Sequence, residues 1–151
     1  MKKPKPYPAR RTLVKRLDTA WSRYIRHRDG YKCVLCGSTY NVQCGHIFSR
    51  VAYSVRWDER NMFSQCSKCN WRHEYNAFPY IKWVEDHFGR AYLDDLQARW
   101  SKPSHFMDHE LWEMCKDIEA RLKQREENNE QPNVYREQPI QCGSGDLGRV
   151  D

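Results

Sequence analysis

The stretches CVLC at residues 33–36 and CSKCN at residues 66–70 decide the fold of this chain. Two cysteines separated by two residues can present both sulfurs to one metal ion from a single tight turn. Four thiolates complete the tetrahedral shell that zinc prefers and leave no position open for substrate, so we expect a structural Zn²⁺. Such an ion would hold together a segment that is too short and too polar to fold alone. The predicted ligands are Cys33, Cys36, Cys66 and Cys69.

The compartment supports a metal site over a disulfide scaffold, which is the alternative for a chain with seven cysteines. The basic N-terminus has no apolar stretch behind it, so it does not resemble a secretory signal. No apolar run approaches the roughly 20 residues that span a bilayer. We therefore predict a cytoplasmic protein, and in a reducing cytoplasm paired cysteines are more often metal ligands than disulfides.

The positive charge of the chain is concentrated at its N-terminal end. Residues 1–28 contain ten lysines and arginines against one acidic residue, a net charge of +9, whereas the remainder carries −3. A basic region of this kind is typical of proteins that bind nucleic acid. For residues 2–11 a solubilising tail is an equal alternative.

The periodicity of apolar residues predicts an α+β fold, in which helices flank a small zinc-bound core. We expect a hairpin with strands at 42–44 and 47–48 around His46. The helices are predicted from residue 12 to about 30, near 68–75, over 78–88, over 92–100 and over 108–125. The corresponding regions are a basic arm and helix (1–30), the core (31–77), C-terminal helices (78–127) and a disordered tail (128–151).

The first predicted helix has an apolar stripe, and the cations beside it would face a phosphate backbone. These cations are Lys15, Arg16, Arg23 and Arg26. The stripe of the last helix, which contains Leu111 and Ile118, would pack within the chain or form the seam of a homodimer.

A histidine and two asparagines follow the order of a known nuclease motif. His46 lies between the cysteine pairs, Asn61 follows it, and Asn70 directly follows the last cysteine. This order resembles the HNH, or ββα-metal, nucleases. The resemblance implies that His46 is the general base and that Asn61 fixes the loop. It also implies that Asn70 binds a catalytic Mg²⁺ or Mn²⁺, for which an amide oxygen is a suitable ligand.

One position departs from that motif. Many HNH nucleases have an aspartate, which is a second metal ligand, directly before the base histidine, and here this position is Gly45. His73 and Glu74 share the helix face of Asn70, so either could complete the metal shell, and His73 is our first candidate.

A longer pattern resembles the phage NinG (Rap) recombination proteins, in which glycine also precedes the histidine. It comprises YIRHRD at 24–29, GHIFSR at 45–50, RWDERN at 56–61 and the QCSKCN run at 65–70. The resemblance covers about residues 12–100. It implies a phage- or prophage-encoded, structure-selective endonuclease that acts on branched DNA, such as Holliday junctions, D-loops and flaps. The Cys-x-x-Cys-Asn ending is also similar to a T-even phage junction-resolving endonuclease.

Cations around the proposed centre would contact DNA, although for each of them a solvated surface position is an equal alternative. They are Arg50, Arg56, Arg60 and Arg72. Trp57, Trp71, Trp83 and Trp100 are predicted to lie in the core rather than to stack on bases.

Two other functions fit the sequence. One is a non-catalytic zinc-finger protein that binds DNA, which the glycine at position 45 favours. The other is an HNH nicking endonuclease for DNA packaging or homing.

Overall fold

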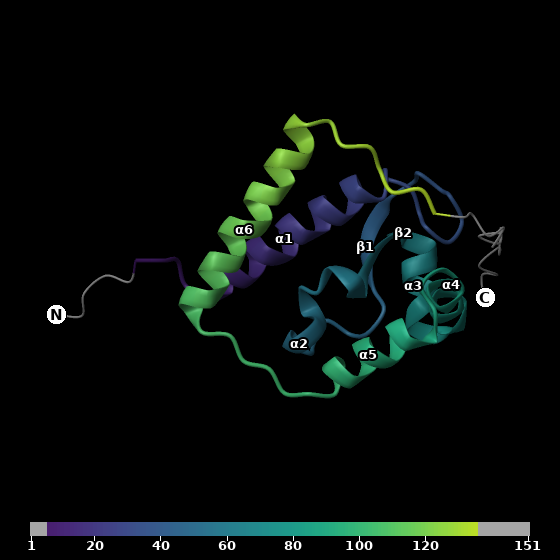
Figure 1. Ribbon diagram of the computed structural model, residues 1–151, viewed down its shortest axis with the longest axis horizontal. Coiled ribbons are helices and arrows are strands. Elements are labelled where there is room, and N and C mark those ends of the chain that lie inside the picture. The colour runs from purple at the N-terminus through teal and green to yellow at the C-terminus, as the bar shows by residue number, and fades with distance from the viewer. Residues whose placement is uncertain (1–5, 136–151) are drawn as a thin grey trace, which may run out of the picture.

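The computed structural model describes residues 6–135 and shows an α+β fold in which helices surround a two-stranded sheet (Figure 1). No helix among these residues is long and apolar enough to cross a membrane. The elements are α1 (Arg10–Arg28), β1 (Val42–His46), α2 (Tyr53–Arg56), the 3₁₀ helix η1 (Glu59–Asn61), β2 (Met62–Cys66), α3 (Ser67–Tyr75), α4 (Phe78–Phe88), α5 (Arg90–Trp100) and α6 (Asp108–Glu127).

Helices α1 and α6 lie side by side and run in the same direction (Figure 1). Leu13 and Leu17 of α1 pack against Leu111 and Ile118 of α6, and all four side chains are fully buried. The apolar stripe of α6 is therefore covered within the chain, as the first of our two alternatives predicted. The oligomeric state stays a prediction.

The strand prediction was wrong in one respect. β1 pairs in antiparallel register with β2, from Val42 opposite Cys66 to His46 opposite Met62, and residues 47–48 belong to a loop. All five residues of β2 are buried because helices cover both faces of the sheet. Its sequence therefore lacks the alternation of apolar and polar residues that marks a half-exposed strand.

Side chains from the end of α1 complete the hydrogen bonding along the outer edge of β2. Arg28 donates to the carbonyl oxygen of Met62 at 2.8 Å, and Asp29 accepts from the amide of Ser64 at 2.8 Å. The two side chains also form a buried ion pair at 2.7 Å. Burial alone would lower the pKa of Arg28, but its hydrogen bonds to Asp29 raise this pKa above the ordinary value.

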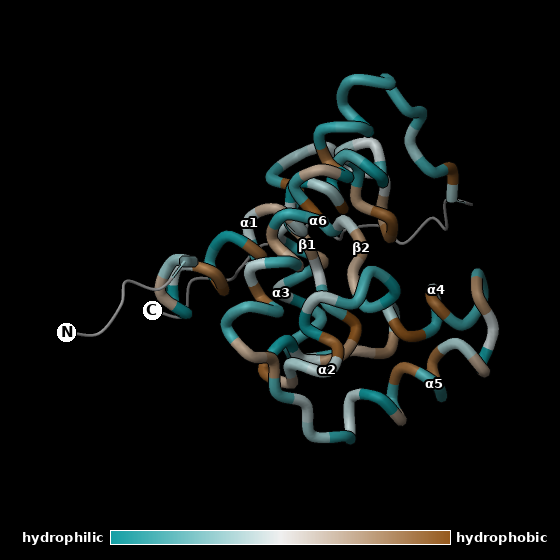
Figure 2. Tube along the Cα trace, turned by 60° about the vertical axis from the view of Figure 1, so that its left-hand side comes forward, coloured by the Kyte–Doolittle hydropathy of each residue, from teal (hydrophilic) through white to brown (hydrophobic). Residues whose placement is uncertain are grey.

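The sheet separates two apolar clusters. Phe63 faces Trp83 and Tyr80 of α4, whereas Met62 faces α1 and α6. Hydrophobic and hydrophilic residues accordingly alternate along α4 and α5 in Figure 2.

The four tryptophans predicted to lie in the core differ in their environments. Trp57 and Trp83 are buried, as predicted. Trp71 and Trp100 are exposed, so the prediction was wrong for both, and Trp100 stacks on Phe48 at the surface.

The chain after α6 returns to the core, although we expected disorder from residue 128. The amide of Asn133 donates to the carbonyl oxygen of Arg28 at 2.7 Å, and the hydroxyl of Tyr135 donates to Asp29 at 3.1 Å. The rest of the predicted tail lies outside the described residues.

The packing of α6 on α1 should contribute more stability than the ion pairs beside it. Ile118→Ala should lower the free energy of unfolding by about 2–5 kcal/mol, because it opens a cavity in the buried interface. Glu126→Gln removes the acidic partner of the exposed Arg23. This substitution should change the free energy of unfolding by less than about 1 kcal/mol. Urea unfolding of both variants measures the difference, and equal effects would contradict this account.

Candidate functional site

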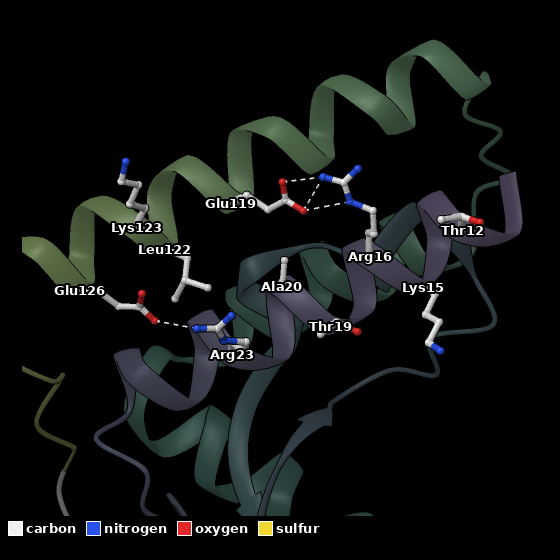
Figure 3. A pocket seen from close by; sticks show the side chains of 10 residues that line it. All are labelled: Thr12, Lys15, Arg16, Thr19, Ala20, Arg23, Glu119, Leu122, Lys123 and Glu126. Carbon is white, nitrogen blue, oxygen red and sulfur yellow. Dashed lines mark hydrogen bonds and ion pairs between the residues drawn. The ribbon is translucent and has the colours of Figure 1, made fainter. Parts of the chain in front are cut away.

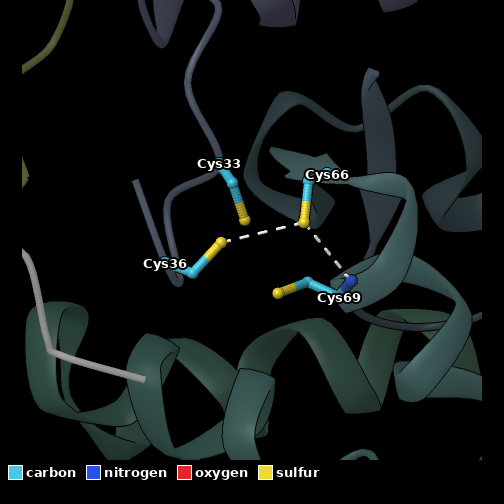
Figure 4. A group of neighbouring side chains, drawn as sticks. All are labelled: Cys33, Cys36, Cys66 and Cys69. Carbon is cyan, nitrogen blue, oxygen red and sulfur yellow. Dashed lines mark hydrogen bonds between the residues drawn. The ribbon is translucent and has the colours of Figure 1, made fainter. Parts of the chain in front are cut away.

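The structure brings the four predicted zinc ligands together (Figure 4). Their sulfur atoms all lie within 4.8 Å of one another, and the Sγ atoms of Cys36 and Cys66 are 3.7 Å apart. A tetrahedral zinc with Zn–S bonds of about 2.3 Å requires sulfur–sulfur separations near 3.8 Å. The cluster therefore fits a structural zinc ion.

The local backbone explains this geometry. Gly37 adopts a φ of +72°, and its amide donates to the carbonyl oxygen of Cys33, which closes the first turn. Cys66 precedes α3, and its Sγ accepts a hydrogen bond from the amide of Cys69. The hydrogen bond from Cys69 lowers the pKa of Cys33, which favours the thiolate that binds metal. Cys44 is outside this cluster, and burial raises its pKa to about 12.

A hollow of about 650 Å³ lies beside β1, and most of the predicted catalytic residues line it. Its walls come from α1, β1, the loop after β1, and α3. The lining residues are Ser22, Gln43, Cys44, His46, Ser49, Arg50, Val51, Asn70, His73 and Glu74.

His46 is held at the end of β1 by a backbone carbonyl. Its Nε2 lies 3.0 Å from the carbonyl oxygen of Arg56. A carbonyl can only accept, so Nε2 carries the proton and Nδ1 keeps a free electron pair. Burial lowers the pKa of His46 below its ordinary value, and this favours the neutral ring at pH 7.

Asn61 is fully buried, and its side chain holds the loop after β1 in place through hydrogen bonds to the backbone. Its Oδ1 accepts from the amide of Phe48 at 2.8 Å, and its Nδ2 donates to the carbonyl oxygens of Phe48 and Val55. Asn61 does not line the hollow. It shapes the segment that carries Ser49 and Arg50 into it.

Three residues of α3 face the hollow in different ways. Asn70 donates from Nδ2 to Oε1 of Gln43 at 3.0 Å, so its Oδ1 is the remaining acceptor. His73 uses Nε2 to bind the carbonyl oxygen of Ile47 at 3.1 Å, and its ring packs on Tyr80. Glu74 is exposed and lies one turn after Asn70. Of the two residues predicted to complete a metal shell with Asn70, His73 therefore has Nε2 engaged by a backbone carbonyl, whereas Glu74 is exposed beside the hollow.

The glycine at position 45 has a structural reason. A Cβ atom on Gly45 would lie 2.1 Å from Oε1 and 2.7 Å from Cδ of Gln65, which is fully buried. The amide of Gln65 thus occupies the space that an aspartate at position 45 would need. Neither polar atom of that amide has a hydrogen-bond partner among the described residues.

The predicted DNA-contacting cations fall into two groups. One group forms ion pairs with acidic side chains of the chain itself, and the two pairs between α1 and α6 are visible in Figure 3. It contains Arg16 (with Glu119), Arg23 (with Glu126), Arg56 (with Asp18) and Arg60 (with Asp95). Lys15, Arg26, Arg50 and Arg72 have no such partner within residues 6–135.

Asp18 and the Arg28–Asp29 pair were not predicted to be structural residues. Asp18 binds both Arg56 and the indole nitrogen of Trp57, and it is the one acid within the basic segment. The presence of a single acidic residue among ten basic ones was the sequence signal that could have identified Asp18 as a structural ion-pair partner.

Comparison with known proteins assigns the family. The family model described as Bacteriophage Lambda NinG protein matches residues 2–130. The chain belongs to the NinG family. Among NinG relatives, it is 30% identical over 116 residues to Protein ninG of Salmonella phage P22, covering 74% of this chain and 55% of that protein. It is 28% identical over 116 residues to Protein ninG of Escherichia phage lambda, covering 74% of this chain and 54% of that one.

This NinG-family chain spans about half the length of the curated relatives that it matches. No solved structure matches it at a significant level.

Loss of one zinc ligand should unfold the core. Cys36→Ser should abolish stoichiometric zinc binding and the cooperative thermal transition, because binding of a structural zinc contributes directly to folding. Cys115→Ser is the matched control, since this buried thiol contacts α1 instead of the cluster. Atomic absorption and thermal denaturation measure both properties, and a zinc-free, fully stable Cys36→Ser protein would contradict the assignment.

Gly45 and Gln65 should be energetically coupled. Gly45→Ala should destabilise the protein by about 1–3 kcal/mol, because Gln65 must leave its buried position. Gln65→Ala in the same chain should remove the clash, so the double variant should be more stable than the sum of the single effects allows. Additive effects in denaturant unfolding would show that the two positions do not compete for space.

Proposed function

We propose that this protein is a metal-dependent DNA endonuclease in which β1, β2 and α3 form a ββα-metal core on a structural zinc site. The observation that carries the proposal is that His46, Asn70 and Glu74 line one hollow. Asn61 meanwhile fixes the loop that closes one side of it.

His46 would act as the general base. Hydrolysis of a phosphodiester requires a group that removes a proton from the attacking water. With its Nε2 hydrogen directed to the carbonyl oxygen of Arg56, the ring can accept that proton at Nδ1. The same hydrogen bond stabilises the imidazolium that results.

Asn70 and Glu74 would hold a Mg²⁺ or Mn²⁺ ion. Gln43 orients the amide of Asn70 so that Oδ1 is available, and amide and carboxylate oxygens suit these hard cations. Such a cation would stabilise the charge that develops on the phosphate and on the leaving oxygen. Because Gln65 fills the space beside Gly45, the protein ligands would come from α3 alone.

Branched DNA is the substrate that we propose, within phage recombination. Support comes from family membership and from Arg50 and Arg72, two cations near the hollow that lack acidic partners within the described part of the chain. Such cations can neutralise backbone phosphates on either side of the cleaved bond.

The decisive experiment compares cleavage of four-way junctions, flaps and plain duplex in Mg²⁺, in Mn²⁺ and in EDTA. Metal-dependent cleavage of the branched substrates is expected. A non-catalytic zinc protein would bind DNA in EDTA and cleave none of these substrates. A nicking enzyme for packaging or homing would cut plain duplex as well as the branched forms.

His46→Ala should abolish cleavage while zinc content, folding and DNA binding stay close to those of the parent protein. His109→Ala, which changes an exposed histidine on α6, is the matched control and should retain full activity. Single-turnover cleavage assays measure the effect. Undiminished cleavage by His46→Ala would exclude its role as base.

A further inference from the structure

We propose that Trp71 and Tyr75 form a stacking surface for unpaired nucleobases beside the hollow. The inference rests on the proposed function, since it names what the nuclease would recognise in its DNA. The two residues are one turn apart on α3, and their ring centroids are 4.7 Å apart.

Exposure sets these rings apart from the aromatic residues of the core. Trp71 is 57% exposed and Tyr75 is 72% exposed, whereas Trp21, Trp57 and Trp83 are at most 7% exposed. Leaving a large apolar ring in water forgoes the stabilisation that burial would provide. The two rings touch at an interplanar angle of 56°, so each offers its own exposed face that a partner can cover.

The position of the rings connects them to the hollow. Trp71 and Tyr75 each directly follow a residue that lines it, namely Asn70 and Glu74. Consecutive residues of an α-helix are separated by about 100° of rotation and a rise of about 1.5 Å. The aromatic stripe therefore runs alongside the stripe that we assign to the catalytic metal, within reach of a nucleotide next to the cleaved bond.

The surrounding charges favour a nucleic acid over a protein or lipid partner. Lys68 and Arg72 lie on the same helix, and Arg50 lines the hollow from the loop after β1. None of these three cations pairs with an acidic side chain in residues 6–135. Cations interleaved with exposed aromatic rings are the pattern that binds single-stranded segments, because phosphates and bases are contacted together.

Only unpaired bases can use this surface. In an intact duplex the faces of the bases are covered by their neighbours, whereas a gap, a fork or a junction exposes them. A ring that stacks on one base typically strengthens binding by about 5- to 150-fold. Trp71 and Tyr75 would thus make the enzyme prefer branched over plain DNA.

The experiment measures DNA binding in the His46→Ala background, so that the result does not depend on cleavage. Trp71→Ala and Tyr75→Ala should each weaken binding to a gapped duplex by at least about 5-fold and change binding to intact duplex less than 2-fold. Trp71→Phe should retain most of the affinity. A 2-aminopurine placed in the gap should report stacking through fluorescence quenching that Trp71→Ala removes.

Two controls separate stacking from charge and from misfolding. Lys68→Ala should weaken binding to both DNAs equally and reduce the salt dependence. Tyr31→Ala, which changes an exposed aromatic residue on a different segment, should leave binding to both DNAs and its salt dependence unchanged. Equal loss on both DNAs for Trp71→Ala, or unchanged quenching, would overturn the proposal. A change in self-association without a change in DNA binding would instead identify the stripe as a contact between copies of the chain.

Discussion

The buried ion pair between Arg28 and Asp29 supports the rest of the structure. A two-stranded sheet is marginally stable by itself, and its outer strand leaves backbone groups unpaired. Here the guanidinium and the carboxylate satisfy those groups at Met62 and Ser64, and each compensates the charge of the other. Removing one partner of such a pair typically costs about 3–5 kcal/mol, because the other charge stays buried. The pair thereby fixes α1, the sheet and the returning C-terminal segment as one unit.

Local signals explain why the four-cysteine cluster and the five longer helices could be predicted, whereas the short helices α2 and η1 were not. The cysteine spacing expresses the geometry of one metal ion, and the helix over Phe78–Phe88 ends at a glycine with a φ of +85°. β2 could not be predicted in the same way, since it is buried on both faces and pairs with a strand distant in sequence. Pairing of that kind depends on tertiary contacts, which composition does not encode locally.

In the candidate site, too, some features could be predicted from local sequence and others depend on tertiary packing. The order of His46, Asn61 and Asn70 in the chain singled them out, and the structure places His46 and Asn70 at one hollow with Asn61 behind the loop beside it. Which side chain occupies the space beside Gly45 depends on packing between strands, so Gln65 was not foreseen. The exposure of Trp71 likewise depends on which faces of α3 the other helices leave uncovered.

Three successive residues of helix α3 point to different surroundings: Cys69 belongs to the four-cysteine cluster, Asn70 faces the hollow, and Trp71 faces solvent. A single inserted or deleted residue after Cys69 would rotate everything that follows by about 100°. The aromatic ring would then turn into the hollow, or the asparagine would turn away from it. The length of this segment is consequently fixed, because the three side chains keep their separate directions only when no residue is added or removed.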